Sequence, residues 1–255
     1  METARRVERL IERPYRVRFD EAGPDGYLRA SGYLRYAQDL AWIHSELAGF
    51  GREWYGERGL TWLARAIELE IDSPVTYGTE LDVTTRLTGF RRVWARRMSE
   101  FRLHGQPDEI ARATTDWVLI NADGRPVRPP DGVIEAFGSD LADFAPLRLP
   151  DNAPPPDALS HESTIRRGEL DPLGHLNNAA YLDYLDEHYL DAGRHDALPA
   201  KRRYRIEFVA PAAPGTKVTG LGWADGDEWC YRLEADGREL FRATLEVPAA
   251  IRAGG

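Results

Sequence analysis

The order of apolar and polar positions divides the chain into two similar runs of secondary structure. Each run begins with a short strand, at residues 15–19 and 163–167, and continues through a loop into an amphipathic helix. The helices are predicted at about residues 31–48 and 177–191. In the second helix, Tyr181, Leu182 and Leu185 stand at the i, i+1 and i+4 spacing of one helical face.

Each helix is followed by a series of partly alternating segments that read as strands. Asp-Gly pairs at 123–124, 225–226 and 236–237 predict tight turns between them. One helix followed by antiparallel strands predicts an α+β fold, in which a curled sheet wraps around a central helix. Pairing the two sheets edge to edge would cover strands that are otherwise exposed. The predicted strands are residues 60–72, 80–87, 93–103, 110–120, 203–209, 217–224, 228–234 and 239–247.

The two runs also match residue by residue. The segment from Gly26 aligns with the segment from Gly174 at an offset of 174 − 26 = 148. Residues 70–79 align with 207–216 at an offset of 137, and Arg112-Ala-Thr with Arg242-Ala-Thr at 130. A repeat of this length indicates a duplicated domain. We therefore predict an N-terminal half over residues 1–144, a semi-rigid proline-rich linker over 145–158 and a C-terminal half over 159–255.

Composition restricts the function classes. The chain has 255 residues, a net charge of −9 and one cysteine, so disulfides and generic nucleic-acid binding are not expected. The charged first ten residues do not form a signal peptide, and no stretch is long and apolar enough to span a membrane. We expect a cytoplasmic protein. The six histidines show no metal-ligand spacing, so no metal is expected either.

The richest chemistry lies in the loop Asp171-Pro-Leu-Gly-His-Leu-Asn-Asn-Ala-Ala-Tyr181, directly before the second helix. Asp171 could activate water or attack an acyl carbonyl directly, and His175 could orient it or bind the substrate oxygen. Gly174 allows close approach of a ligand, and the N–H groups of residues 174–176 could form an oxyanion hole. Asn177 and Asn178 could cap the helix or contact substrate.

This loop resembles the Asp-x-x-Gly-His-Val-Asn-Asn-x-x-Tyr signature of hotdog-fold thioesterases. The first half resembles the N-terminal hotdog of acyl-acyl-carrier-protein (acyl-ACP) thioesterases in four ordered segments. The resemblance implies a tandem hotdog fold and hydrolysis of an acyl thioester at Asp171, Gly174, His175 and Asn177 without a cofactor. The four segments are residues 21–26, 36–44, 62–70 and 117–120.

Two positions depart from the plant-type acyl-ACP enzymes. Leu173 stands where those enzymes have an asparagine, and Pro211 or Ala212 where they have a second carboxylate. The nearest acid, Glu207, lies on the preceding strand and recurs as Glu70, which favours a structural role. The loop is in this respect closer to single-hotdog thioesterases of the 4-hydroxybenzoyl-CoA type.

The first half lacks the acid, imidazole and amides at the matching loop positions, so we expect it to supply the acyl pocket. Trp42 and Trp62 are candidate lining residues, and Asn178 is a candidate substrate contact. Two basic clusters, at residues 86–102 and 201–205, are either solvated strand faces or docking sites for an acidic carrier protein. The docking candidates are Arg92, Arg97, Lys201 and Arg202.

The sequence thus predicts a thioesterase that acts on fatty acyl-ACP. It allows a homodimer but does not decide the oligomeric state. The closest alternative is the same reaction on acyl-CoA. A hotdog dehydratase would need an acid and a histidine in facing halves, and His44 lies too late in its helix for that role. A non-catalytic acyl-binding protein is the alternative from a different functional class.

Overall fold

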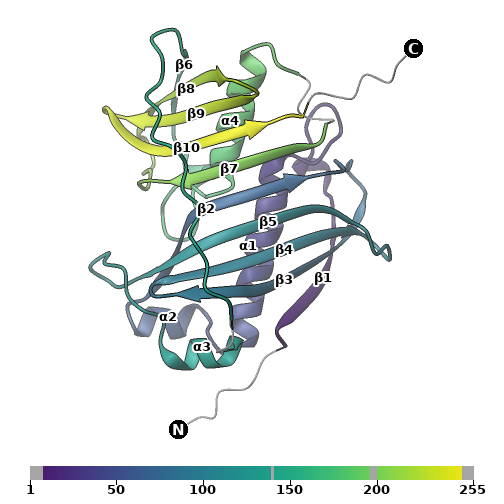
Figure 1. The fold of residues 1–255 in the computed structure, drawn as a ribbon, viewed down its shortest axis with the longest axis vertical. Coiled ribbons are helices and arrows are strands. Elements are labelled where there is room, and N and C mark those ends of the chain that lie inside the picture. Colours follow the sequence, from purple (N-terminus) through teal and green to yellow (C-terminus); the bar gives the residue numbers. More distant parts are fainter. Residues whose placement is uncertain (1–7, 139–140, 196–199, 249–255) are drawn as a thin grey trace.

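The computed structural model describes residues 8–138, 141–195 and 200–248. Within them, ten antiparallel strands form one continuous sheet, in the order β1-β3-β4-β5-β2-β7-β10-β9-β8-β6 (Figure 1). The strands are β1 Leu10–Arg16, β2 Thr61–Ile71, β3 Glu80–Arg91, β4 Trp94–Leu103, β5 Glu109–Ile120, β6 Leu159–Thr164, β7 Arg202–Phe208, β8 Lys217–Asp225, β9 Glu228–Ala235 and β10 Arg238–Glu246.

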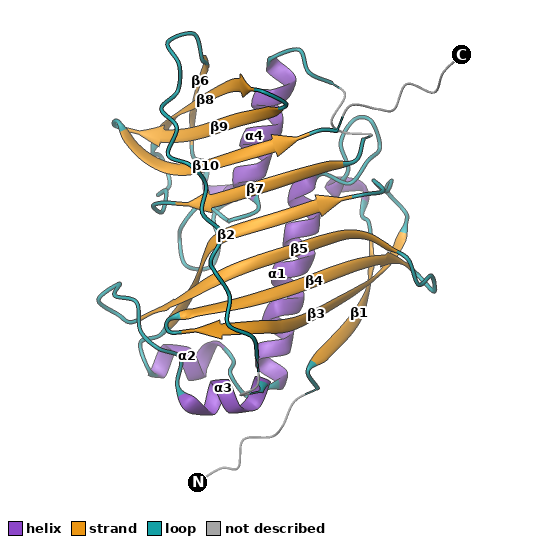
Figure 2. Cartoon of the chain, viewed as in Figure 1, coloured by secondary structure: helices purple, strands orange, loops and turns teal. Residues whose placement is uncertain are grey.

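The two halves meet where β2 pairs with β7, in a register that runs from Ala66 opposite Glu207 to Ile71 opposite Arg202. This confirms the predicted edge-to-edge pairing and the tandem hotdog fold. Both long helices, α1 (Ala30–Leu47) and α4 (Ala180–Asp191), lie on the same face of the sheet (Figure 2). An ion pair of 3.0 Å between Arg35 and Asp183 joins them across the junction.

The long helices form because their apolar residues recur at helical spacing. In α1, the buried Tyr33, Ala37, Leu40 and His44 lie on one face, toward the sheet. The side chains of both helices and of the sheet's inner face make one continuous core, so the halves share their apolar interior.

The internal duplication extends to hydrogen bonds. Glu21 accepts hydrogen bonds from the Tyr36 hydroxyl and the Arg18 N–H. Glu169 accepts the same pair, from the Tyr184 hydroxyl and the Arg166 N–H, 148 residues later. Backbone bonds repeat as well: Leu28 N–H to Val75 and Leu176 N–H to Ala212, Asp72 N–H to Ile110 and Val209 N–H to Leu240.

Two short helices, α2 (Arg52–Glu57) and α3 (Asp131–Phe137), were not predicted. Six or seven residues are too few to show a helical period. With the end of α1 and part of the sheet they enclose a second apolar cluster that contains Phe50, Tyr55 and Phe137. The predicted first strands of the two halves begin too late: β1 starts at Leu10 and β6 at Leu159.

The proline-rich segment crosses the outer face of the sheet, opposite the helices (Figure 1). Side chains of the strands hold it there, so it is tied down along its length. The hydrogen bonds are Arg91 to the Phe144 carbonyl at 2.8 Å, Arg96 to the Ala145 carbonyl at 3.0 Å, the Leu147 N–H to Asp116 at 2.9 Å, Arg148 to Glu207 at 2.7 Å and Arg232 to Asp151 at 2.8 Å.

Candidate active site

Asp171 holds its own loop in shape. One carboxylate oxygen, Oδ1, accepts the backbone N–H groups of Leu173 at 2.8 Å and His175 at 3.2 Å. The predicted link to His175 is therefore made through the backbone, and the imidazole itself lies exposed. Gly174 takes φ +80°, which a side chain would strain, and so permits the turn. Within the described residues, the second oxygen of Asp171 makes no hydrogen bond and is available for chemistry.

The prediction that the N–H groups of residues 174–176 form an oxyanion hole is wrong, because all three donate hydrogen bonds within the fold. The N–H of Gly174 bonds the carbonyl of Asp171, the N–H of His175 bonds the Asp171 carboxylate, and the N–H of Leu176 bonds the carbonyl of Ala212. The N–H of Asn178, at the start of α4, has no partner among the residues that the structure describes. It lies at the positive end of the helix dipole.

The two asparagines have different places. The Oδ1 of Asn177 accepts the Ala179 N–H at 2.9 Å in the turn before α4, whereas the N-cap residue of α4 is Ala179, which has no side-chain cap bond. The prediction that one of the two asparagines caps the helix is therefore wrong. The backbone N–H of Asn177 bonds the carbonyl of Glu169 at 2.9 Å. The side-chain oxygen and the backbone N–H of Asn177 are thus both bonded within the loop, whereas Asn178 lines the pocket.

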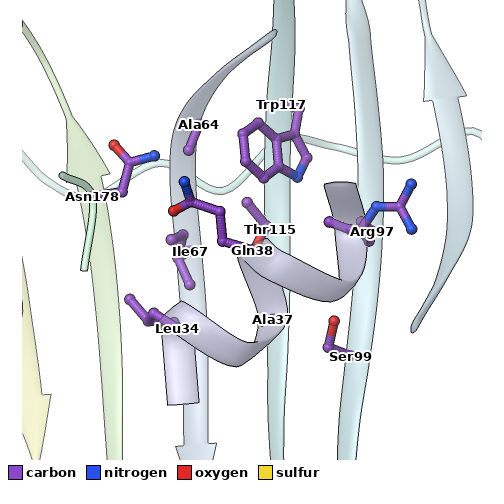
Figure 3. Close-up of a pocket in the computed structure, with 11 residues that line it drawn as sticks. Leu34, Ala37, Gln38, Ala64, Ile67, Arg97, Ser99, Thr115, Trp117 and Asn178 are labelled. Atoms are coloured by element: carbon purple, nitrogen blue, oxygen red, sulfur yellow. The ribbon is translucent and has the colours of Figure 1, made fainter. Parts of the chain in front are cut away.

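A pocket runs between α1 and the inner face of β2, β4 and β5 (Figure 3). Leu34, Ala37, Gln38 and Ala41 line it from one face of α1, at i, i+3, i+4 and i+7. Asn178 reaches it from the second half. The remaining lining residues are Ala64, Ile67, Arg97, Ser99, Thr115 and Trp117.

Arg97 lies at the far side of the pocket and is buried, with 7% of its surface exposed. Its Nη1 donates to Nδ1 of His44 at 2.9 Å and to the Thr85 hydroxyl at 3.3 Å. Burial and the neighbouring Arg97 lower the pKa of His44 to about 4, so the imidazole is neutral at pH 7 and can accept this bond. The basic side chain therefore belongs to the protein interior.

The two predicted pocket tryptophans lie elsewhere. Trp42 is 41% exposed and bonds Glu46 along the helix, and Trp62 donates to the Tyr55 hydroxyl beside the second apolar cluster. Trp117 on β5 lines the pocket instead. Alternation shows which residues share a face with Trp117, but only the pairing of the strands decides which face meets α1.

Glu207 faces away from this site. On β7, Tyr204, Ile206 and Phe208 point into the core, so Glu207 points to the outer face. There its carboxylate accepts Arg148 at 2.7 Å and the Leu149 N–H at 3.2 Å. This agrees with a structural role.

Replacing Glu207 tests that role. Glu207→Ala leaves the Leu149 N–H without its acceptor, so we expect the free energy of unfolding to fall by about 2 kcal/mol in urea denaturation. If the chain has the thioesterase activity that the sequence predicts, we expect its kcat, measured well below the unfolding temperature, to stay within twofold of wild type. Glu162→Ala, on the exposed strand β6, serves as the control. A large loss of kcat with unchanged stability would instead place Glu207 in the reaction.

A family model described as the acyl-ACP thioesterase N-terminal domain matches residues 8–137, just over half of the chain. The chain belongs to the acyl-ACP thioesterase family. Among curated relatives, the chloroplastic acyl-acyl-carrier-protein hydrolase FATB2 of Cuphea viscosissima is 24% identical over 93% of this chain. The match covers 62% of that relative, so the chain spans about three fifths of its length.

Solved structures share the architecture. A putative oleoyl thioesterase from Lactobacillus plantarum superimposes with a TM-score of 0.81 at 19% identity, over 92% of this chain and 94% of the other. A 12:0-ACP thioesterase from Umbellularia californica superimposes with a TM-score of 0.76 at 21% identity, over 94% of this chain and 97% of the other. At identities of 19% and 21%, these superpositions establish only the fold of this member of the acyl-ACP thioesterase family.

The predicted docking clusters are not open basic patches. Arg97 and Arg202 are buried, at 7% and 1% exposure, so neither can meet a carrier protein at the surface. Lys201 pairs with Asp72 at 2.5 Å, and Arg92 is exposed at the β3–β4 turn. Three acids, two of them outside residues 86–102, pair with the other arginines of the first cluster. These pairs are Arg86 and Arg102 with Glu100, Arg96 with Asp116 and Arg91 with Asp143.

In the part of the chain that the structure describes, no three His, Cys, Asp or Glu side chains gather as metal ligands would. No described helix is long and apolar enough to cross a membrane.

Proposed function

We propose that the chain hydrolyses fatty acyl-ACP to a free fatty acid and the carrier thiol. One observation carries the proposal: the pocket of the first half reaches Asn178, whose backbone N–H at the start of α4 is unbonded among the described residues. Six of the eleven lining residues are apolar, which suits an acyl chain, although the pocket has a volume of about 10 Å³ and has to widen to admit one; the N–H suits a carbonyl oxygen. Family membership and the names of the curated relatives support the substrate class.

The reaction we propose uses Asp171 as the base. Its unbonded carboxylate oxygen takes a proton from water as the water oxygen attacks the thioester carbonyl carbon. The carbonyl electron pair moves to oxygen, where the Asn178 N–H and the α4 dipole stabilise the negative charge. The C–S bond then breaks, and the proton passes from Asp171 to the leaving thiolate. His175, exposed beside the loop, is proposed to bind the substrate arm.

Carrier preference is tested by parallel assays. We expect kcat/KM for dodecanoyl-ACP to exceed that for dodecanoyl-CoA, with a steep decline for the ACP substrate as ionic strength rises. A higher kcat/KM on the CoA ester would make the chain an acyl-CoA thioesterase of the same fold. Binding of both esters without hydrolysis of either would identify an acyl-binding protein. Homodimer formation and a cytoplasmic location remain predictions from the sequence.

A further inference from the structure

The second-half loop supplies few groups to a reacting thioester. Leu173 and Ala212 carry no polar side chain, and the N–H groups of residues 174–176 are all engaged within the fold. Only the Asn178 N–H remains in that stretch of the described loop. An oxyanion is best stabilised by more than one donor, so a second donor has to come from another element.

Gln38 is placed to be that donor. It lies on α1, lines the same pocket as Asn178, and its amide lies between Asn178 and Trp117 in Figure 3. Gln38 is half-buried, and its side chain has no hydrogen-bond partner among the described residues. The Gln38 amide is accessible from the pocket, so its N–H is free to bond a ligand there.

The junction between the halves fixes the position of Gln38. The ion pair between Arg35 and Asp183 ties α1 to α4 one turn before Gln38 and close after Asn178. Pairing of β2 with β7 holds the two sheets in register beneath the helices. Gln38 and Asn178 therefore face one pocket from different halves with little freedom to separate.

We propose that Gln38 is a catalytic residue of the first half, whose side-chain N–H binds the thioester carbonyl oxygen together with the backbone N–H of Asn178. This inference rests on the proposed thioesterase function and deepens it. The first half, emptied of acid and imidazole, then contributes a donor to the reaction as well as the acyl pocket.

The test is Gln38→Leu, which keeps most of the side-chain volume and removes the donor. We expect kcat on dodecanoyl-ACP to fall about 100-fold with KM within threefold of wild type. A trifluoromethyl ketone analogue of the acyl-pantetheine thioester, whose hydrate or adduct carries the oxyanion, should lose affinity by a similar factor. Gln106→Leu, the same change at an exposed turn between β4 and β5, should leave both values unchanged.

Several results would overturn the inference. Full kcat in Gln38→Leu, or a loss confined to KM with unchanged affinity for the ketone, would show that Gln38 only lines the pocket. Asn178→Ala keeps the backbone donor, so a large kcat loss there together with full kcat in Gln38→Leu would assign the second donor to the Asn178 side chain. If wild type hydrolyses no thioester, the proposed function fails and this inference fails with it.

Discussion

Asp171→Asn is expected to lower kcat for acyl-ACP hydrolysis by 10²- to 10⁴-fold, about the contribution of a positioned general base. The substitution is informative because the structure separates two roles of this side chain. Its Oδ1 holds the loop through the N–H groups of Leu173 and His175, and an asparagine Oδ1 can still accept both bonds. Its other oxygen becomes an amide nitrogen, which cannot take a proton from water.

Asp25 provides the matched control. Its Oδ1 accepts the Tyr27 N–H at 3.1 Å in the equivalent loop of the first half, where no imidazole or free amide accompanies it. We expect Asp25→Asn to retain wild-type kcat and both variants to unfold near the wild-type temperature. Equal activity of Asp171→Asn and wild type would remove Asp171 from the reaction. A loss of activity that follows a loss of stability would limit it to a role in loop structure.

Ala41→Phe is expected to lower kcat/KM for long acyl chains strongly while sparing short chains. The pocket follows α1 from Leu34 to Ala41, about 10 Å at the rise of an α-helix. Arg97, at the far side, bonds His44 one turn after Ala41, so Ala41 marks the end remote from Asn178. A phenyl ring there would displace the distal part of a bound chain.

The size of this effect follows from apolar burial. If the ring excludes about four methylenes, each worth about 0.8 kcal/mol, kcat/KM for dodecanoyl-ACP falls by about 200-fold. Hexanoyl-ACP should lose less than threefold. Leu47→Phe adds a ring at the exposed end of α1 and should change neither value. A uniform loss over all chain lengths would indicate a folding defect, and no loss would place the acyl chain outside this pocket.

The architecture could be predicted from the sequence because it is encoded locally and encoded twice. The alternation of apolar and polar residues predicts the ends of β2 to β5 and of β7 to β10 within a few residues. The segments that align at offsets of 148, 137 and 130 form equivalent backbone hydrogen bonds in the two halves. The predicted asparagine cap is wrong, because Asn177 bonds the Ala179 N–H in the preceding turn and α4 begins only at Ala180.

The site could be predicted only in part, since its residues come from both halves. Gln38 gave no sequence signal: it is one amide on an amphipathic helix, and only the pairing of β2 with β7 brings it opposite Asn178. Arg97 looked like a surface charge because strand alternation does not say which face is inward. The sequence also does not show that the Asn178 N–H is the unbonded donor of the loop. That outcome depends on the backbone hydrogen bonds of the turn at Gly174.

The central claim is that one active site is built from the loop of the second half and the pocket of the first. A crystal structure of Asp171→Asn with a bound dodecanoyl-pantetheine thioester tests it most directly. The account predicts the acyl chain between α1 and strands β2, β4 and β5, with the carbonyl oxygen within hydrogen-bond distance of the Asn178 N–H. An acyl chain bound on the outer face beneath the proline-rich segment, or wholly within the second half, would contradict it.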